Sequence, residues 1–144
     1  MARGGLTRIY PYGYIPLVLG PLKRLVWMGS TLEDLRVLPR QVRRRIGLAL
    51  DWAQRGGMHP SARLMKGPGL RGVLEVVDDF DGDTFRAAYI ARLATAIYVL
   101  HVFKKKSTRG IATPHRHLDL IRRRLNSARR LDERGDHEAH QKNA

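Results

Sequence analysis

Apolar residues recur every three or four positions in two stretches of the chain, a spacing that predicts amphipathic helices. In the first stretch these residues are Val42, Ile46, Ala49, Leu50 and Ala53. In the second they are Leu118, Ile121, Leu125 and Ala128. Each stretch follows a proline, Pro39 or Pro114, which suits the first turn of a helix. Residues 30–33 (Ser-Thr-Leu-Glu) fit a capping box and predict a shorter helix that ends at Leu38.

Four other runs are apolar at alternate or at all positions and predict β-strands. They cover residues 22–28, 73–77, 85–93 and 95–103. Between the second and third runs, Asp81-Gly82 is a strong signal for a two-residue hairpin turn. The order of these elements predicts an α+β fold with a small, mainly antiparallel sheet. This sheet is expected to pack on an N-terminal helical hairpin and to be followed by a C-terminal helix.

The last of these strands is apolar at both parities, as expected when both faces of a strand are covered. Simple alternation puts Ile97, Val99 and Phe103 on one face. It puts Tyr98, Leu100 and Val102 on the other.

The elements predict one domain with two loose ends, since 144 residues suffice for a single core. Residues 1–21 carry four glycines and three prolines without periodicity, and we expect an irregular N-terminal extension. Residues 22–131 hold the predicted strands and helices. Residues 132–144 are polar, and we expect a disordered tail. Residues 57–70 are expected to form a long loop rich in glycine and proline.

The composition narrows the classes of partner and chemistry. A formal net charge of +14 favours nucleic acid, an acidic protein or an anionic membrane surface as the partner. No apolar run approaches the ~18 residues of a transmembrane helix, and residues 15–19 are too short for the core of a signal peptide. The lack of cysteine excludes disulfides and thiolate catalysis. We therefore expect a cytoplasmic protein that uses no metal ion or other cofactor.

The positive charge is concentrated late in the chain. From Arg63 to Arg92, five basic residues meet five acidic ones, whereas from His101 to Arg124 eight basic residues meet Asp119 alone. The surface that faces a polyanion is therefore expected around the last strand and the helix after it.

Arg86 lies near the middle of a predicted strand, where an arginine is costly unless it is paired or faces a wet groove. Alternation puts Arg86 and Arg92 on one face of the strand, about 20 Å apart, so the two can contact different phosphates of one RNA strand. A salt bridge to Glu75 on the neighbouring strand is the alternative for Arg86. The sequence leaves both open.

His101 is the histidine that falls within a predicted strand. It is either a hydrogen-bonded core residue or a general acid or base beside Lys104–Lys106, whose positive field would lower its pKa. His115 and His117 form a weak metal-binding signal at the start of the last helix. Such a set suits RNA transesterification, in which a base activates the 2′-OH, cations stabilise the phosphate charge and an acid protonates the leaving 5′ oxygen.

Three segments carry a resemblance to a known family: FRAAY (Phe85–Tyr89), YVLHVFKKK (Tyr98–Lys106) and TPHRHLDL (Thr113–Leu120). They resemble the RelE/HigB toxin superfamily, most closely its phage-derived branch, over roughly Lys23 to Arg130. The resemblance implies a sheet packed on two N-terminal helices. It also implies a metal-independent endoribonuclease that cuts mRNA on the ribosome and inhibits translation. Its implied partner is a co-encoded antitoxin with a helix-turn-helix domain.

The resemblance also implies the site residues. Arg86 looks like the family's phosphate-binding arginine, and Lys104 and Lys105 look like its cationic cluster, with His101 in the same segment. The catalytic set is thus Arg86, His101, Lys104 and Lys105. Further RNA-binding residues, chosen as basic positions near the sheet and the last strand, are Lys66, Arg71, Arg92, Lys106 and Arg109. The chain departs from the family at His117, where relatives often carry an acidic residue.

Two other functions remain open at this point. ParE-like relatives share the fold but inhibit DNA gyrase, and that role would not need Arg86 or His101 as chemical groups. A non-enzymatic RNA- or ribosome-binding protein would need the positive charge without an acid–base pair.

Overall fold

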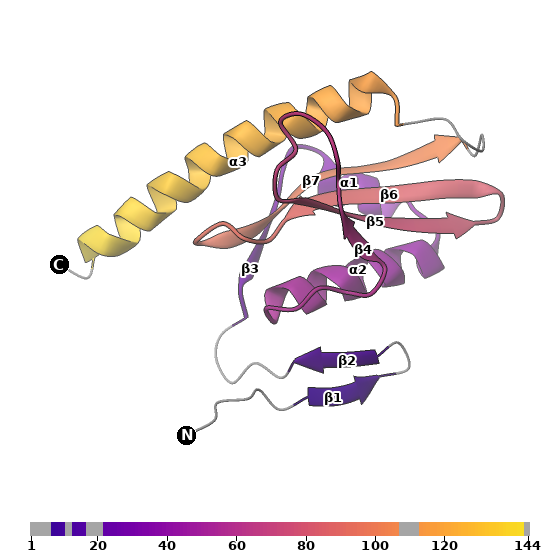
Figure 1. Cartoon of the computed structure of the whole chain (residues 1–144), viewed down its shortest axis with the longest axis horizontal. Coiled ribbons are helices and arrows are strands. Elements are labelled where there is room, and N and C mark those ends of the chain that lie inside the picture. Colours follow the sequence, from indigo (N-terminus) through magenta and orange to yellow (C-terminus); the bar gives the residue numbers. More distant parts are fainter. Residues whose placement is uncertain (1–6, 11–12, 17–21, 107–112, 143–144) are drawn as a thin grey trace.

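A five-stranded sheet forms the centre of the molecule (Figure 1). The computed structural model describes residues 7–10, 13–16, 22–106 and 113–142. Its elements follow in the order β1 (Thr7–Tyr10), β2 (Gly13–Pro16), β3 (Arg24–Trp27), α1 (Thr31–Arg36), α2 (Arg40–Gln54), β4 (Ala62–Leu64), β5 (Val73–Phe80), β6 (Asp83–Ile90), β7 (Ala96–Lys106) and α3 (His115–Lys142).

The strands of the main sheet are ordered β3-β7-β6-β5-β4. The pair β3 and β7 is parallel, whereas the other three pairs are antiparallel. The strands β1 and β2 form a separate antiparallel pair. The predicted fold class is confirmed: a mostly antiparallel sheet, two N-terminal helices and a C-terminal helix, consistent with a RelE-like fold.

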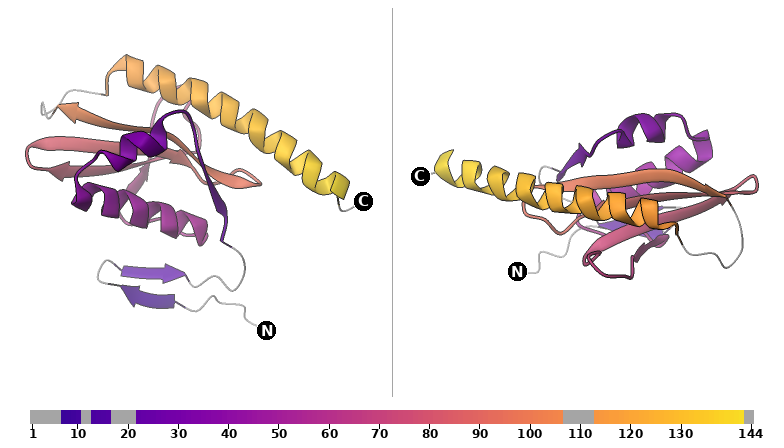
Figure 2. Two further views of the ribbon diagram at one scale, coloured as in Figure 1. Left: turned by 180° about the vertical axis from the view of Figure 1, so that it is seen from behind. Right: turned by 90° about the horizontal axis from the view of Figure 1, so that it is seen from above.

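Each face of the sheet has its own apolar core. The α1 and α2 helices cover one face, and α3 crosses the other (Figure 2). On the α2 side, the fully buried residues include Val42, Ile46, Ala49, Ala87, Ile97 and Val99. On the α3 side they include Leu70, Val73, Ala96, Leu100, Ile121 and Ala128. The strands between the helices are therefore buried on both sides, as the sequence predicts for β7.

A β-bulge in β7 changes which side chains face α3. Ala88 pairs with His101, but the next residue, Tyr89, pairs with Val99, so Leu100 is an extra residue on β7. Leu100 belongs to the α3-side core, and beyond the bulge Phe103 does too. Simple alternation puts Phe103 on the α2 side, and this expectation is wrong because the bulge shifts the parity by one residue. Val102 takes the α2-side position instead.

The turn between β5 and β6 is the two-residue turn that the sequence predicts. Asp81 and Gly82 have φ angles of 51° and 81°, and Phe80 pairs with Asp83 across them. Left-handed backbone at both central residues matches the twist of the two strands. The hairpin thereby fixes the register that places Arg86 opposite Val77.

The helix α3 continues past residue 131, where the sequence predicts a disordered tail. Asp132 is buried, and its carboxylate accepts hydrogen bonds from the backbone N–H of Ala94 (2.7 Å) and of Thr95 (2.8 Å). These bonds anchor the helix to the β6–β7 connection. Residues 132–142 are therefore helical despite their polar composition, and α3 is anchored at Asp132 and runs to Lys142.

Three other local expectations differ from the structure. The β1–β2 pair lies within the segment expected to be irregular, and β4 lies within the expected 57–70 loop. The Ser30 hydroxyl donates to the carboxylate of Asp34 at 2.8 Å and makes no side-chain cap, so the capping box is wrong. The division of the chain at residues 22 and 131 stays a prediction.

Candidate functional site

Nine residues of three neighbouring strands form a patch on the face of the sheet that α3 crosses. The strand register aligns them in three rows, and residues two apart on a strand share one face. The rows are Glu75, Ala88 and His101; Val77, Arg86 and Phe103; and Asp79, Thr84 and Lys105. We call these residues the central patch. Arg86 occupies its middle position, so the structure brings Arg86, His101 and Lys105 together on one face of the sheet.

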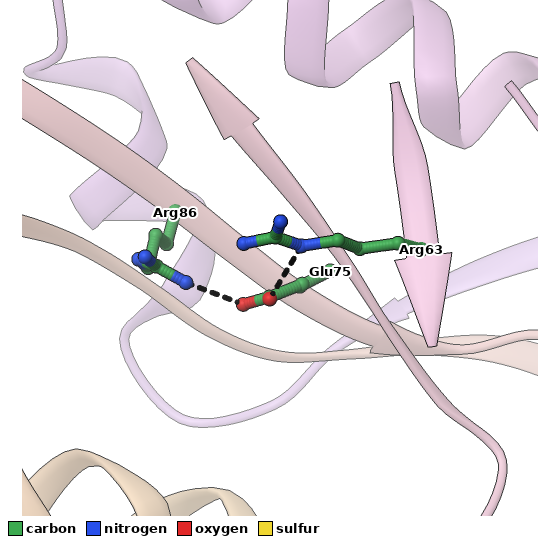
Figure 3. A network of polar contacts seen from close by, with 3 residues as sticks. All are labelled: Arg63, Glu75 and Arg86. Carbon is green, nitrogen blue, oxygen red and sulfur yellow. Dashed lines mark hydrogen bonds and ion pairs between the residues drawn. The ribbon is translucent and has the colours of Figure 1, made fainter. Parts of the chain in front are cut away.

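Arg86 is held by a carboxylate within the patch (Figure 3). Its Nη1 donates to Glu75 Oε2 at 2.9 Å, and Arg63 Nε on β4 donates to Glu75 Oε1 at 3.0 Å. The salt bridge that the sequence leaves open is therefore formed. The side chains of Glu75 and Arg86 are 9% and 14% exposed, whereas that of Arg63 is 62% exposed. Glu75 thus fixes a mostly buried arginine from one side and an exposed arginine from the other.

The guanidinium of Arg86 keeps donor capacity beyond this pair. Among the described residues, its buried Nε has no hydrogen-bond partner. A guanidinium carries five N–H donors and binds phosphate oxygens well. Arg86 therefore has donor capacity that its pair with Glu75 does not use.

His101 forms a cluster of three rings with Phe103 and His117. His101 Nε2 lies 2.8 Å from His117 Nδ1, so one of these nitrogens carries the shared proton. Phe103 stacks on both imidazoles, at centroid distances of 4.5 Å to His101 and 4.1 Å to His117. His117 comes from the first turn of α3, and the cluster joins this turn to the end of β7.

Burial lowers the pKa of His101 from 6.5 to about 4, with further lowering by His117 and by Arg124. Burial also lowers the pKa of His117, and Arg116 lowers it further. The direction agrees with the sequence expectation for His101, but the cause differs, because burial replaces the expected lysine field. Both imidazoles are therefore neutral at pH 7.

Lys104 and Lys105 lie on opposite faces of the sheet. Lys105 shares the face of Phe103 and belongs to the central patch, whereas Lys104 follows Val102 on the α2 side. Lys104 Nζ forms a salt bridge with Asp83 at 3.0 Å. The sequence groups both lysines with Arg86, but the structure brings only Lys105 of this pair onto its face.

The five further basic residues are spread over the molecule. Arg71 precedes β5 and Arg92 follows β6, so both lie at the end of the sheet away from the Asp81-Gly82 turn. Lys66 is exposed between β4 and β5, and Lys106 ends β7. Arg109 lies outside the described residues. The structure therefore does not gather Lys66, Arg71 and Arg92 around the central patch.

Sequence reasoning missed two residues next to the patch. The glycine- and proline-rich composition of residues 57–70 predicts a loop, so the sequence does not indicate that Arg63 on β4 pairs with Glu75. His117 had a signal, the His-x-His spacing after Thr113-Pro114, but this spacing is only a weak metal-binding signal and does not indicate a contact with His101. Instead, His117 contacts His101, while His115 is exposed. In the described part of the chain, no three His, Asp or Glu side chains gather in a group that could hold a metal ion.

None of the helices in the described residues combines the length and apolarity needed to cross a bilayer. The α3 helix has the length, but seven arginines interrupt its first twenty residues.

One comparison with known proteins gives a match. The family model described as phage-derived protein Gp49-like (DUF891) matches residues 33–126, which is more than half of the chain. The matched region runs from α1 into α3 and contains the central patch, Arg63 and His117. No curated protein and no solved structure matches the chain.

Proposed function

This chain belongs to the phage-derived Gp49-like family, known as toxins of toxin–antitoxin systems, and we propose that it is an mRNA interferase of the RelE/HigB type. A toxin of this kind implies an antitoxin partner. We propose further that this antitoxin carries a helix-turn-helix domain. The proposed reaction is metal-independent cleavage of mRNA on the ribosome, which stops translation.

The observation that carries the proposal is the position of Arg86 in the central patch. Lys105 lies one row away on one side, and His101 lies one row away on the other. Neighbouring strands are about 4.8 Å apart and residues two apart on a strand about 6.6 Å. His101 and Lys105 are therefore about 13 Å apart along β7, with Arg86 between them on β6. A phosphate bound at Arg86 would face Lys105 on one side, and its ribose would face the histidines on the other.

Arg86 and Lys105 are assigned to the scissile phosphate. In transesterification the 2′-OH loses its proton to a base and the 2′ oxygen bonds to phosphorus, while the bond to the 5′ oxygen breaks and that oxygen takes up a proton from water. The products are a 2′,3′-cyclic phosphate and a 5′-hydroxyl end. Negative charge on the phosphate oxygens grows in the transition state, and fixed cations stabilise it most there. The salt bridge to Glu75 holds the Arg86 guanidinium in place before the RNA binds.

The pair His101 and His117 is assigned to proton transfer from the 2′-OH. A neutral imidazole is the basic form, and the low pKa of both rings keeps them neutral at pH 7. When His117 Nδ1 carries the shared proton, His117 Nε2 has the free lone pair of a general base. His117 is only partly buried, whereas His101 is 8% exposed, so His117 is the member that solvent and RNA reach more easily.

The other proposed RNA contacts serve binding rather than cleavage. They are Lys66, Arg71, Arg92, Lys106 and Arg109 on this chain, and Lys104 on the α2 side of β7. In this proposal the ribosome positions the mRNA for cleavage.

A second candidate is a toxin that acts by binding, such as a ParE-like inhibitor of DNA gyrase. One observation favours this candidate: Arg86 and His101 already have partners within the protein. Arg86 pairs with Glu75, and His101 is hydrogen-bonded to His117. In such a protein the same contacts stabilise the fold and transfer no proton.

Induction of the chain in bacteria, followed by mapping of RNA 5′ ends, separates the two candidates. The proposal expects growth arrest, loss of intact transcripts and new 5′-hydroxyl ends within translated regions. Growth arrest with intact mRNA and accumulating gyrase–DNA breaks would support the second candidate instead.

A further inference from the structure

The seven arginines of α3 divide into two groups by what they contact. Three turn toward the rest of the protein and donate to backbone carbonyls: Arg122 to Pro68 (2.7 Å), Arg124 to Leu100 (2.9 Å) and Arg129 to Arg71 (3.1 Å). They hold the β4–β5 connection and β7 against the helix. These three arginines are therefore part of the packing of α3.

The other four arginines form one row along the exposed side of α3. They are Arg116, Arg123, Arg130 and Arg134. Spacings of seven, seven and four residues keep them within about 40° of one another around the helix axis. All four are exposed, and the row lies opposite the buried residues Ile121, Leu125 and Ala128. We call these four residues the arginine row.

The arginine row is long and straight. From Arg116 to Arg134 it spans 18 residue steps, or about 27 Å along the helix. The C-terminal end of α3 projects past the edge of the sheet (Figures 1 and 2). The helix is still packed on the β6–β7 connection at Asp132 and Gly135, so the row ends where α3 leaves the body of the protein. Adjacent guanidinium groups are about 6 to 10 Å apart along the axis. This spacing suits a linear polyanion better than one compact anion.

Within the described side chains, no carboxylate neutralises the charge of the row. In the part of the chain that the structure describes, none of the four arginines forms a salt bridge. Arg130 Nη2 donates a hydrogen bond to Ser127 Oγ. The nearby carboxylate of Asp119 is paired with Arg122 instead. A partner that supplies negative charge would therefore find these guanidinium groups available.

We propose that the arginine row binds the sugar–phosphate backbone of double-helical RNA, as a surface separate from the central patch. Arginine binds phosphate oxygens through two parallel hydrogen bonds, and a row of such contacts follows a backbone. A-form RNA presents a wide, shallow minor groove bordered by phosphates, which a convex helix surface can reach.

An acidic protein fits this surface less well. Interfaces between proteins have an apolar centre, whereas Leu131 is the one exposed large apolar residue of the described α3 side chains and lies beside the row. The proposal also goes beyond the family match, because Arg130 and Arg134 follow residue 126, where the match ends. It does not require the central patch to be catalytic.

The test compares two triple variants of the full-length protein that remove the same charge. The first, R116Q/R123Q/R130Q, neutralises three members of the row. The matched control, R40Q/R43Q/R44Q, neutralises three exposed arginines of α2 on the other side of the sheet. Glutamine retains a high helix propensity, and circular dichroism verifies that both variants keep their helix content. The probe is a short 2′-O-methyl RNA duplex, which lacks the 2′-OH and is therefore not cleaved.

The row variant is expected to bind the duplex at least tenfold more weakly than the parent. The slope of log affinity against log salt should fall by about 2 to 3, one unit for each lost phosphate contact. The control variant should stay within about twofold of the parent, and R86A should retain duplex binding, which separates this surface from the proposed cleavage site. Equal losses in both triple variants, unchanged binding by the row variant, or tighter binding to a DNA duplex of the same sequence would overturn the proposal.

Discussion

The carboxylate of Glu75 lies between two guanidinium groups and accepts a hydrogen bond from Arg86 Nη1 at 2.9 Å. The other group is that of Arg63, on the opposite side of Glu75. Because Glu75 is buried, it both fixes the position of Arg86 and reduces the positive charge that Arg86 presents. An RNA phosphate that binds Arg86 must share this arginine with Glu75.

The first prediction concerns the substitution Glu75→Gln. It should strengthen the binding of uncleavable RNA about tenfold, because Arg86 and Arg63 lose the negative charge that competes with phosphate. It should also lower the free energy of unfolding by about 2 kcal/mol, since a mostly buried arginine loses its charged partner. Asp83→Asn removes a carboxylate paired with Lys104 on the other face and serves as the control. RNA affinity that changes equally in both variants would show that only net charge matters.

Lys105→Gln and Lys104→Gln should differ, because the two side chains lie on opposite faces of β7. Lys105→Gln should weaken RNA binding and cleavage together, by about tenfold, since it removes a cation from the central patch. Lys104→Gln loses an exposed salt bridge and should change stability by at most about 1 kcal/mol and cleavage by less than about threefold. Equal defects would place the RNA around the end of β7 rather than on the α3 side.

The low pKa of His101 makes stability depend on pH. The pKa is about 4 in the folded protein and 6.5 for an unperturbed histidine, so the unfolded chain binds the proton more readily. Stability should therefore be full above about pH 6.5 and fall as the pH drops toward 4, by on the order of 2 to 3 kcal/mol. Denaturant titrations between pH 5 and 7 measure this loss. His101→Gln should flatten the profile, while the exposed His115→Gln should leave it unchanged; a profile unaffected by His101→Gln would contradict the assigned shift.

Much of the fold follows from local patterns in the sequence. The stripe that begins at Val42 predicts α2, and Asp81-Gly82 predicts the β5–β6 hairpin, because each depends on residues close together in the chain. The sequence offers the pairing of Arg86 with Glu75 only as one of two alternatives, and the structure shows that the pair is formed. Strand parity on β6 also places Arg86 correctly on the face of Ala88 and Ile90.

The remaining differences come from contacts between distant residues. The bulge at Leu100 moves Phe103 and His101 to the α3 side, and no local signal in β7 marks an extra residue. Lys104 and Lys105, as neighbours on a strand, face opposite sides in any register, and the shift decides that Lys105 is the one that shares the face of Arg86. Asp132 looks like part of a polar tail until its backbone partners at Ala94 and Thr95, nearly forty positions earlier, are known.

The anchor at Asp132 can be tested by truncation. A chain that ends at Leu131 loses the carboxylate that binds Ala94 and Thr95 and should lose about 2 kcal/mol or more of unfolding free energy. A chain that ends at Asp136 keeps this carboxylate and should retain nearly full stability. Thermal unfolding of both truncated chains, and of Asp132→Asn at full length, measures the effect. Equal stability of the two truncated chains would mean that residues 132–136 contribute nothing to the domain.

The central claim is that Arg86 acts on the phosphate of a cleaved mRNA, and single-turnover cleavage by the purified protein tests it most directly. Ribosomes carrying a defined mRNA are mixed with excess parent protein, Arg86→Ala or Arg86→Lys, after each variant is shown to be folded by its melting temperature. Arg86→Ala should retain its fold, because Glu75 keeps Arg63 as a partner.

The parent should produce 5′-hydroxyl ends within the message. Arg86→Ala should slow the first-order cleavage rate by about a hundredfold or more with little change in the concentration needed for half-maximal rate, because the arginine acts mainly in the transition state. Arg86→Lys should recover part of this rate. A folded Arg86→Ala protein that cleaves as fast as the parent, or a parent protein that leaves the message intact on the ribosome, would contradict the account.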